Sequence, residues 1–254
     1  MSSWTQFGIT WFRTMAKAQP REVELLGEAV KFDVCHSSDA TEPRIDVDIH
    51  GISVVIPESE SVRPAELLKQ NAAWVIEKKR EYDKYREQIP ERRFQPGETF
   101  LYLGEPHQVV VEQRPSSSVA DGTFRLAEYH VENTSVKRAL ETLYRRKARQ
   151  RFERRAEHFA GKMEVECDQI EIRNQRTKWG SCSSNGTLGL NWRLMMSPSE
   201  IVDYVIIHEL VHLREQNHNQ SFWSLVAEHD PDYKDHVRWL EENSTRLIFS
   251  EDDL

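Results

Sequence analysis

The stretch SPSEIVDYVIIHELVHLREQNH, residues 197–218, decides how the rest of the chain is interpreted. Ser197 is suited to a helix N-cap, Pro198 to the first helical position, and Glu200 lies three residues after the cap, which together form a capping box. Apolar residues predominate from Ile201 to Ile207. The pattern therefore predicts a helix that begins at Ser197 and carries the polar cluster near its end.

The polar cluster is the motif HExxH, formed by His208, Glu209 and His212. Residues four apart on an α-helix share a face and are separated by about 6 Å along the axis, so both imidazoles can bind one ion. Glu209 lies beside that ion and can take a proton from a water molecule held there. We predict one Zn²⁺ ion with Glu209 as the catalytic general base.

A third ligand is needed because catalytic zinc usually takes three protein ligands and leaves one position open. His218 lies ten residues after His208, which on a continuous helix is about 15 Å away. The helix must therefore end, and Asn217 can adopt the left-handed conformation that ends helices and returns His218 to the ion. Glu228 on the following segment is the alternative third ligand, and Cys182 is a less favoured one.

The spacing HELVHLREQNH equals the metzincin pattern, but Glu215 stands where that pattern has glycine and no methionine follows Met196. Residues 176–223, from RTKWGSCSSNGTLGLNW to SFW, instead resemble the YgjP-like zinc metallopeptidases, which are relatives of the SprT-like proteases. The resemblance extends from about residue 44 to residue 243. It implies a zinc-dependent peptidase with a small mixed sheet packed on the active-site helix.

The same resemblance implies site residues and partners. Zinc is held at the positions of His208, His212 and His218, Glu209 is the base, and the segment Trp179–Cys182 borders the active-site cleft. A peptide or protein is the implied substrate. From the residues alone, Gly180 permits a close backbone approach to a substrate strand or a neighbouring helix. Tyr233 and His236 are candidate donors to a developing oxyanion.

Composition limits the class of protein. Hydrophobic residues make up 38% and charged residues 30% of 254, with a net charge of −8. This charge argues against a surface that is coated by nucleic acid. The first 20 residues lack the apolar region of a signal peptide, and no apolar run is long enough for a membrane span. Three cysteines without CxxC spacing predict a reducing compartment, the cytoplasm.

Patterns elsewhere in the chain predict an α+β fold with a mixed, largely antiparallel sheet, a zincin-like active-site helix and C-terminal helices. Alternation and turn residues predict hairpins at 45–56, 100–111 and around 184–186, and a strand at 124–131. Helical spacing predicts helices at 64–87 and 135–160. The predicted domains are an arm at 1–43, a metallopeptidase domain at 44–246 with halves 44–160 and 161–246, and an acidic tail at 247–254.

One face of the 135–160 helix suggests an alternative function. The stretch 137–155 is rich in basic residues and contains only two acidic ones, Glu141 and Glu153. Such a face is commonly just solvated, but it can also contact phosphates of DNA. The alternative prediction is therefore a nucleic-acid-associated binding module whose metal site is structural or vestigial. The basic residues are Lys137, Arg138, Arg145, Arg146, Lys147, Arg149, Arg151, Arg154 and Arg155.

Overall fold

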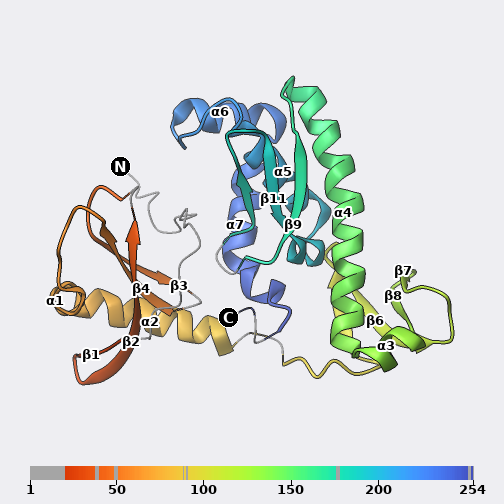
Figure 1. Cartoon of the computed structure of the whole chain (residues 1–254), viewed down its shortest axis with the longest axis horizontal. Helices are drawn as coiled ribbons and strands as arrows, with labels where there is room; N and C mark the ends of the chain where they lie inside the picture. Colours follow the sequence, from red (N-terminus) through yellow and green to blue (C-terminus); the bar gives the residue numbers. More distant parts are fainter. Residues whose placement is uncertain are drawn as a thin grey trace. The chain divides into compact units, whose positions relative to one another are not determined.

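The computed structural model describes residues 21–37, 40–48, 51–87, 89, 91–175, 178–250 and 253. Helices and strands are both present, so the predicted α+β class is confirmed (Figure 1). The chain divides into two compact units, one within residues 1–89 and the other within residues 90–253. The signal-peptide prediction and the first part of the predicted arm concern residues 1–20, which lie outside the described residues.

The first unit contains one four-stranded sheet in the order β1-β2-β4-β3. The strands are β1 (Arg21–Leu25), β2 (Glu28–Ser37), β3 (Arg44–Asp48) and β4 (Gly51–Pro57). β3 and β4 form the predicted antiparallel hairpin, whereas β2 and β4 are parallel. β1 and β2 occupy a segment that the sequence pattern left unassigned. Their alternating apolar side chains, such as Val23, Leu25 and Phe32, are buried in the core of this unit.

Two helices, α1 (Pro64–Gln70) and α2 (Ala72–Glu87), replace the single helix predicted for 64–87. They are separated at Asn71, whose backbone angles of φ −110° and ψ 19° are not helical. The Asn71 side-chain amide donates a hydrogen bond to the Leu67 carbonyl at 2.9 Å. Asparagine competes in this way with the helical backbone pattern. Leu68, Val75 and Ile76 complete the core of the unit.

The second unit contains two further sheets, with the strand orders β5-β6-β8-β7 and β10-β11-β9. The strands are β5 (Thr99–Tyr102), β6 (Glu105–Glu112), β7 (Ser118–Ala120), β8 (Thr123–Ala127), β9 (Gln169–Arg173), β10 (Gly180–Cys182) and β11 (Thr187–Asn191). The β5–β6 and β10–β11 pairs are the two other predicted hairpins. The strand predicted for 124–131 ends at Ala127, where helix α3 (Glu128–Asn133) begins. Each sheet has one parallel pair, and antiparallel pairs predominate.

The long helix α4 (Val136–Met163) supports the site-bearing part of the second unit. The Ser135 hydroxyl accepts a hydrogen bond from the Arg138 backbone N–H at 3.1 Å and caps the first turn. Glu164 ends the helix in the left-handed conformation, with φ 51°. The helix packs against α5 (Ser199–Val211) and β9 (Figure 1). The predicted buried side is confirmed by Ala139, Leu140, Leu143, Ala148, Phe152, Ala156 and Phe159.

The capping box predicted at the start of α5 is wrong. The Ser197 hydroxyl donates to the Leu194 carbonyl at 2.7 Å and so closes the preceding 3₁₀ helix η1 (Trp192–Met196). Pro198 takes the N-cap position without a side-chain cap. Most of α5 is buried on all sides, because its neighbours α4, α6 (Gln220–His229), α7 (Tyr233–Asn243), β10 and β11 surround it. A helix held in this way gives its side chains fixed positions.

The segment predicted as an acidic tail contributes to the core. The 3₁₀ helix η2 (Ser244–Leu247) leads to Phe249, which is 2% exposed and whose ring lies 5.0 Å from the rings of Phe94 and Trp192. The Asp253 carboxylate accepts hydrogen bonds from the backbone N–H groups of Phe249 and Ser250. None of the helices in the described ranges has the length and apolar character needed to cross a membrane.

Candidate metal centre

His208 and His212 lie where helix α5 ends. His208 is in its last full turn, and His212 is the C-cap residue, with φ −62° and ψ −16°. Both residues are buried, and their ring centroids are 5.2 Å apart. The two imidazoles therefore share one face of the helix, as their four-residue spacing predicts.

His218 reaches the same place through the loop of residues 212–219. The helix ends at Val211 and then unwinds through backbone bonds from Leu213 to Leu210 and from Arg214 to Val211. Asn217 is not among the described residues with positive φ, so the predicted left-handed turn at this position is wrong. The chain needs no such residue because the reversal is spread over several residues. This also explains why Glu215 is tolerated where metzincins have glycine.

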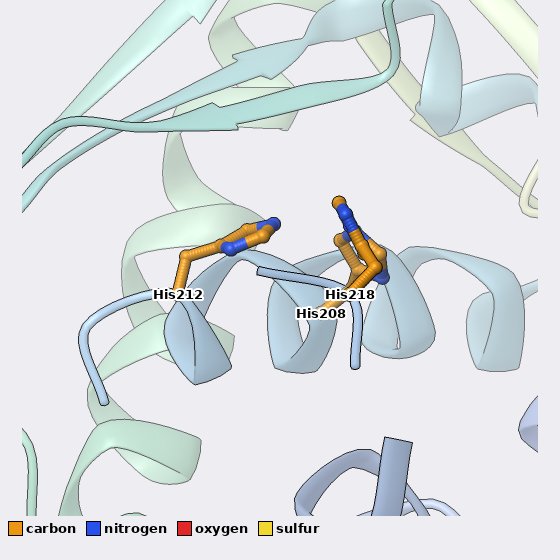
Figure 2. A group of neighbouring side chains, drawn as sticks. All are labelled: His208, His212 and His218. Atoms are coloured by element: carbon orange, nitrogen blue, oxygen red, sulfur yellow. The ribbon is translucent and has the colours of Figure 1, made fainter. Parts of the chain in front are cut away.

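The three imidazoles form one group, as Figure 2 shows from the side of α5. One nitrogen from each ring lies within 4.8 Å of the others. The Nε2 atoms of His208 and His218 are 3.1 Å apart. Zinc binds imidazole nitrogen at about 2.0–2.1 Å, so two tetrahedral ligands lie roughly 3.4 Å apart. His208 and His212 are buried and His218 is exposed, so the group has a buried side and an exposed side.

The second ring nitrogen of His212 has a backbone partner. His212 Nδ1 lies 3.3 Å from the Glu215 carbonyl oxygen, which can only accept, so Nδ1 carries the proton. That tautomer leaves Nε2 with a lone pair for a metal ion. A hydrogen bond to the distal nitrogen also fixes the ring orientation, as is usual for metal-binding histidines.

Aromatic side chains of α6 pack against the three histidines. The fully buried Phe222 ring, from the first turn of α6, lies 4.9, 4.7 and 4.5 Å from the rings of His208, His212 and His218. The Asn219 side chain caps α6 by accepting from the Phe222 N–H at 3.0 Å, which fixes this ring. Trp223 lies 5.8 Å from both His208 and His218. The rings of Phe222 and Trp223 therefore give the imidazoles an apolar environment.

Burial in this setting changes the protonation of the histidines. It lowers the pKa of His208 well below its usual value, helped by the neighbouring His218 and His212. Burial and His218 lower the pKa of His212 to about 4, and burial also lowers the pKa of His218. The charged imidazolium is disfavoured because it cannot be hydrated. All three rings are therefore neutral near pH 7, which is the form that binds metal ions.

Glu209 is 3% exposed and lies between α5 and strand β10. Its Oε2 atom is buried and has no hydrogen-bond partner among the described residues. Burial raises the pKa of Glu209 to about 8, and the buried ammonium group of Lys178 opposes that rise. A metal ion beside it would favour the ionised carboxylate further, since a nearby positive charge lowers the pKa of an acid.

Gly180 is the residue that allows Glu209 to occupy this position. A Cβ atom at Gly180 would lie 2.5 Å from Glu209 Oε1 and 2.6 Å from its Cγ, far below van der Waals contact. The close backbone approach predicted from the sequence is therefore made to the neighbouring helix. It also places the Trp179–Cys182 segment next to the candidate centre.

Gly180→Ala is expected to displace the Glu209 carboxylate while leaving the histidines in place. With Glu209 as the general base expected from the sequence, turnover should fall roughly 100-fold, because a misplacement of about 1 Å can have that effect. Zinc content should remain at the wild-type level. Steady-state kinetics and elemental analysis of the purified variant check this, with Gly161→Ala as the control, since a Cβ at Gly161 meets open space. Wild-type turnover in Gly180→Ala would contradict the assigned position of Glu209.

The alternative ligands lie outside the group. Glu228 is exposed on α6, and neither Glu228 nor Cys182 joins the three histidines among the described residues. Burial, Glu209 and Cys167 raise the pKa of Cys182 to about 12, which disfavours the thiolate that zinc requires. Tyr233 stacks on Trp223 at 5.4 Å, and His236 Nδ1 is held by Asp230 at 2.8 Å.

Sequence reasoning missed Phe222, Trp223 and Lys178. Phe222 and Trp223 are consecutive aromatic residues shortly after His218. This pattern indicates an apolar wall beside the metal group. Lys178 gives no comparable signal, because its proximity to Glu209 arises from the fold and not from local spacing.

At least five of the nine basic residues of the 137–155 stretch have a partner within the chain, and no observation on the described residues supports the DNA-binding alternative. A basic side chain that already has a partner is less available to phosphates. The observed pairs are Arg138 and Arg145 with Glu141, Arg149 with Glu153, Arg155 with Asp203, and Arg146 with the Ser117 carbonyl.

Comparisons with known proteins identify the family. The model of the YgjP-like, metallopeptidase domain family matches residues 41–243. Among solved structures, the metallopeptidase zymogen abylysin of Pyrococcus abyssi is 26% identical, with a TM-score of 0.33; the match covers 36% of this chain and 93% of that one. Comparison with curated proteins gave no match. Since the family model covers most of the chain, this protein belongs to the YgjP-like metallopeptidase family.

Proposed function

We propose that the protein is a zinc-dependent peptidase in which His208, His212 and His218 hold one zinc ion and Glu209 is the general base. The observation that carries this proposal is the convergence of three neutral imidazoles beside a buried carboxylate. Three nitrogen ligands leave a fourth position open, which is typical of catalytic zinc and not of structural zinc. A peptide or protein is the proposed substrate, in keeping with the family.

The chemistry follows from the positions of the residues. His208, His212 and His218 would hold the zinc ion, which would lower the pKa of a water molecule and polarise the substrate carbonyl. Glu209 takes a proton from the attacking water, whose oxygen bonds to the carbonyl carbon. The C–N bond then breaks, and Glu209 gives the proton to the departing amine. The contact with Gly180 holds the carboxylate in one place throughout, and the Lys178 charge favours its ionised form between transfers.

Metal removal tests this proposal. Purified protein loaded with zinc should cleave members of a fluorogenic peptide library, and 1,10-phenanthroline should abolish the cleavage. Added zinc should restore it in proportion to bound metal measured by mass spectrometry. Cleavage that persists in metal-free protein, or a zinc-loaded protein that cleaves no peptide in the library, would contradict the proposal.

Two further proposals, on the location of the protein and on its domain, rest on the sequence. The three cysteines are free thiols, which fits the cytoplasmic location that we propose from their number and spacing. We also propose, from the sequence, a metallopeptidase domain over residues 44–246.

A further inference from the structure

Tyr204 lies one helical turn before His208, on the same face of α5 as His208 and His212. Residues four apart on a helix are neighbours, and the Tyr204 and His208 rings meet edge to face at 5.9 Å. Tyr204 is therefore the next side chain along the surface that holds the candidate zinc ligands.

The Tyr204 side chain is buried, yet its hydroxyl has no partner. The residue is 4% exposed, and no hydrogen bond of its hydroxyl is found within the described part of the chain. A buried tyrosine hydroxyl usually has a hydrogen-bond partner. The hydroxyl is not among the inaccessible polar atoms that lack a partner, so part of its surface faces solvent.

The surroundings of Tyr204 fix its ring. The His236 ring lies 6.1 Å from the Tyr204 ring, and His236 Nδ1 is held at 2.8 Å by the buried carboxylate of Asp230. A tyrosine hydroxyl has an ordinary pKa of about 10, so it is protonated near pH 7 and can donate a hydrogen bond.

We propose that the Tyr204 hydroxyl is a further catalytic group, which donates a hydrogen bond to the substrate carbonyl oxygen as that oxygen gains negative charge. This inference rests on the proposed peptidase function. It assigns the oxyanion donor to α5 itself, in place of the Tyr233 or His236 expected from the sequence. Tyr233 stacks on the Trp223 ring, and His236 supports Tyr204 from the side of α7.

Tyr204→Phe tests the proposal, because it keeps the ring and removes only the oxygen. We expect kcat to fall about 100-fold, as when one oxyanion donor is removed, with little change in KM. Affinity for a phosphinate peptide that mimics the tetrahedral transition state, measured by calorimetry, should fall by a similar factor. Zinc affinity and the midpoint of thermal unfolding should stay at wild-type values. Tyr129→Phe, at an exposed tyrosine on α3, is the matched control and should behave as wild type.

Each other result overturns the proposal. If Tyr204→Phe retains wild-type kcat and phosphinate affinity, its hydroxyl does not touch the reacting carbonyl. If kcat falls together with zinc affinity or thermal stability, Tyr204 is a structural neighbour of His208 and not a donor. A wild-type protein that cleaves no peptide when zinc-loaded contradicts the peptidase function itself, which separates that failure from the failure of Tyr204 alone.

Discussion

Glu209→Gln is expected to lower turnover roughly 1,000-fold, within the range attributed to a positioned general acid–base group, and to leave one zinc ion bound per chain. The amide has the shape of the carboxyl but cannot accept the proton of the attacking water. The fold should tolerate it, because burial already favours the neutral form of Glu209, with a pKa of about 8. Single-turnover kinetics on zinc-loaded protein, with elemental analysis, measure both properties.

Glu228→Gln is the matched control for this experiment, since Glu228 is an exposed acid on α6. It should retain wild-type turnover and zinc content. A Glu209→Gln variant that cleaves peptides at the wild-type rate would show that another group moves the proton. A variant that loses its zinc would show that Glu209 is a ligand and not a base.

His218→Ala is expected to have the second large effect, on metal affinity. Removing a residue that only supports a ligand costs 10–100-fold in affinity, so losing a ligand itself should cost more than about 100-fold. His218 contributes its Nε2 atom 3.1 Å from that of His208, from a loop and not from the helix. The loss should therefore leave α5 folded. Competition with a chromophoric chelator gives the zinc affinity, and circular dichroism gives the helix content.

Two controls isolate the third ligand. His229→Ala removes an imidazole from α6 outside the metal group, and Glu228→Ala removes the alternative ligand. Both should bind zinc as tightly as wild type. Unchanged affinity in His218→Ala, or a large loss in Glu228→Ala, would reassign the third ligand.

Local spacing was enough to predict the part of the site that lies on one helix. His208 and His212 share a face because they are four residues apart, and Glu209 follows from the same spacing. The three hairpins and the buried side of α4 were also predictable, because alternation and helical periodicity are local signals. The convergence of His218 was predicted from the need for a third ligand.

The features that the sequence did not predict depend on contacts between distant segments. After α5 ends at Val211, the loop brings the His218 ring onto Phe222 without a left-handed residue at Asn217. The sequence pattern indicated Ser197 as the cap of α5. Its hydroxyl instead donates to the Leu194 carbonyl in the preceding turn, a contact that the pattern does not predict. Phe249 was assigned to a tail because acidic residues follow it in the sequence. Its ring contacts Phe94 and Trp192, which are distant in sequence, so the local pattern does not predict these contacts.

X-ray absorption at the zinc K-edge of the wild-type protein tests the central claim most directly. We predict three imidazole nitrogens at about 2.0–2.1 Å and one light oxygen ligand, with one of the three nitrogens lost in His218→Ala. A spectrum with a sulfur ligand near 2.3 Å, or with only two imidazoles in the wild type, would contradict a centre built from His208, His212 and His218.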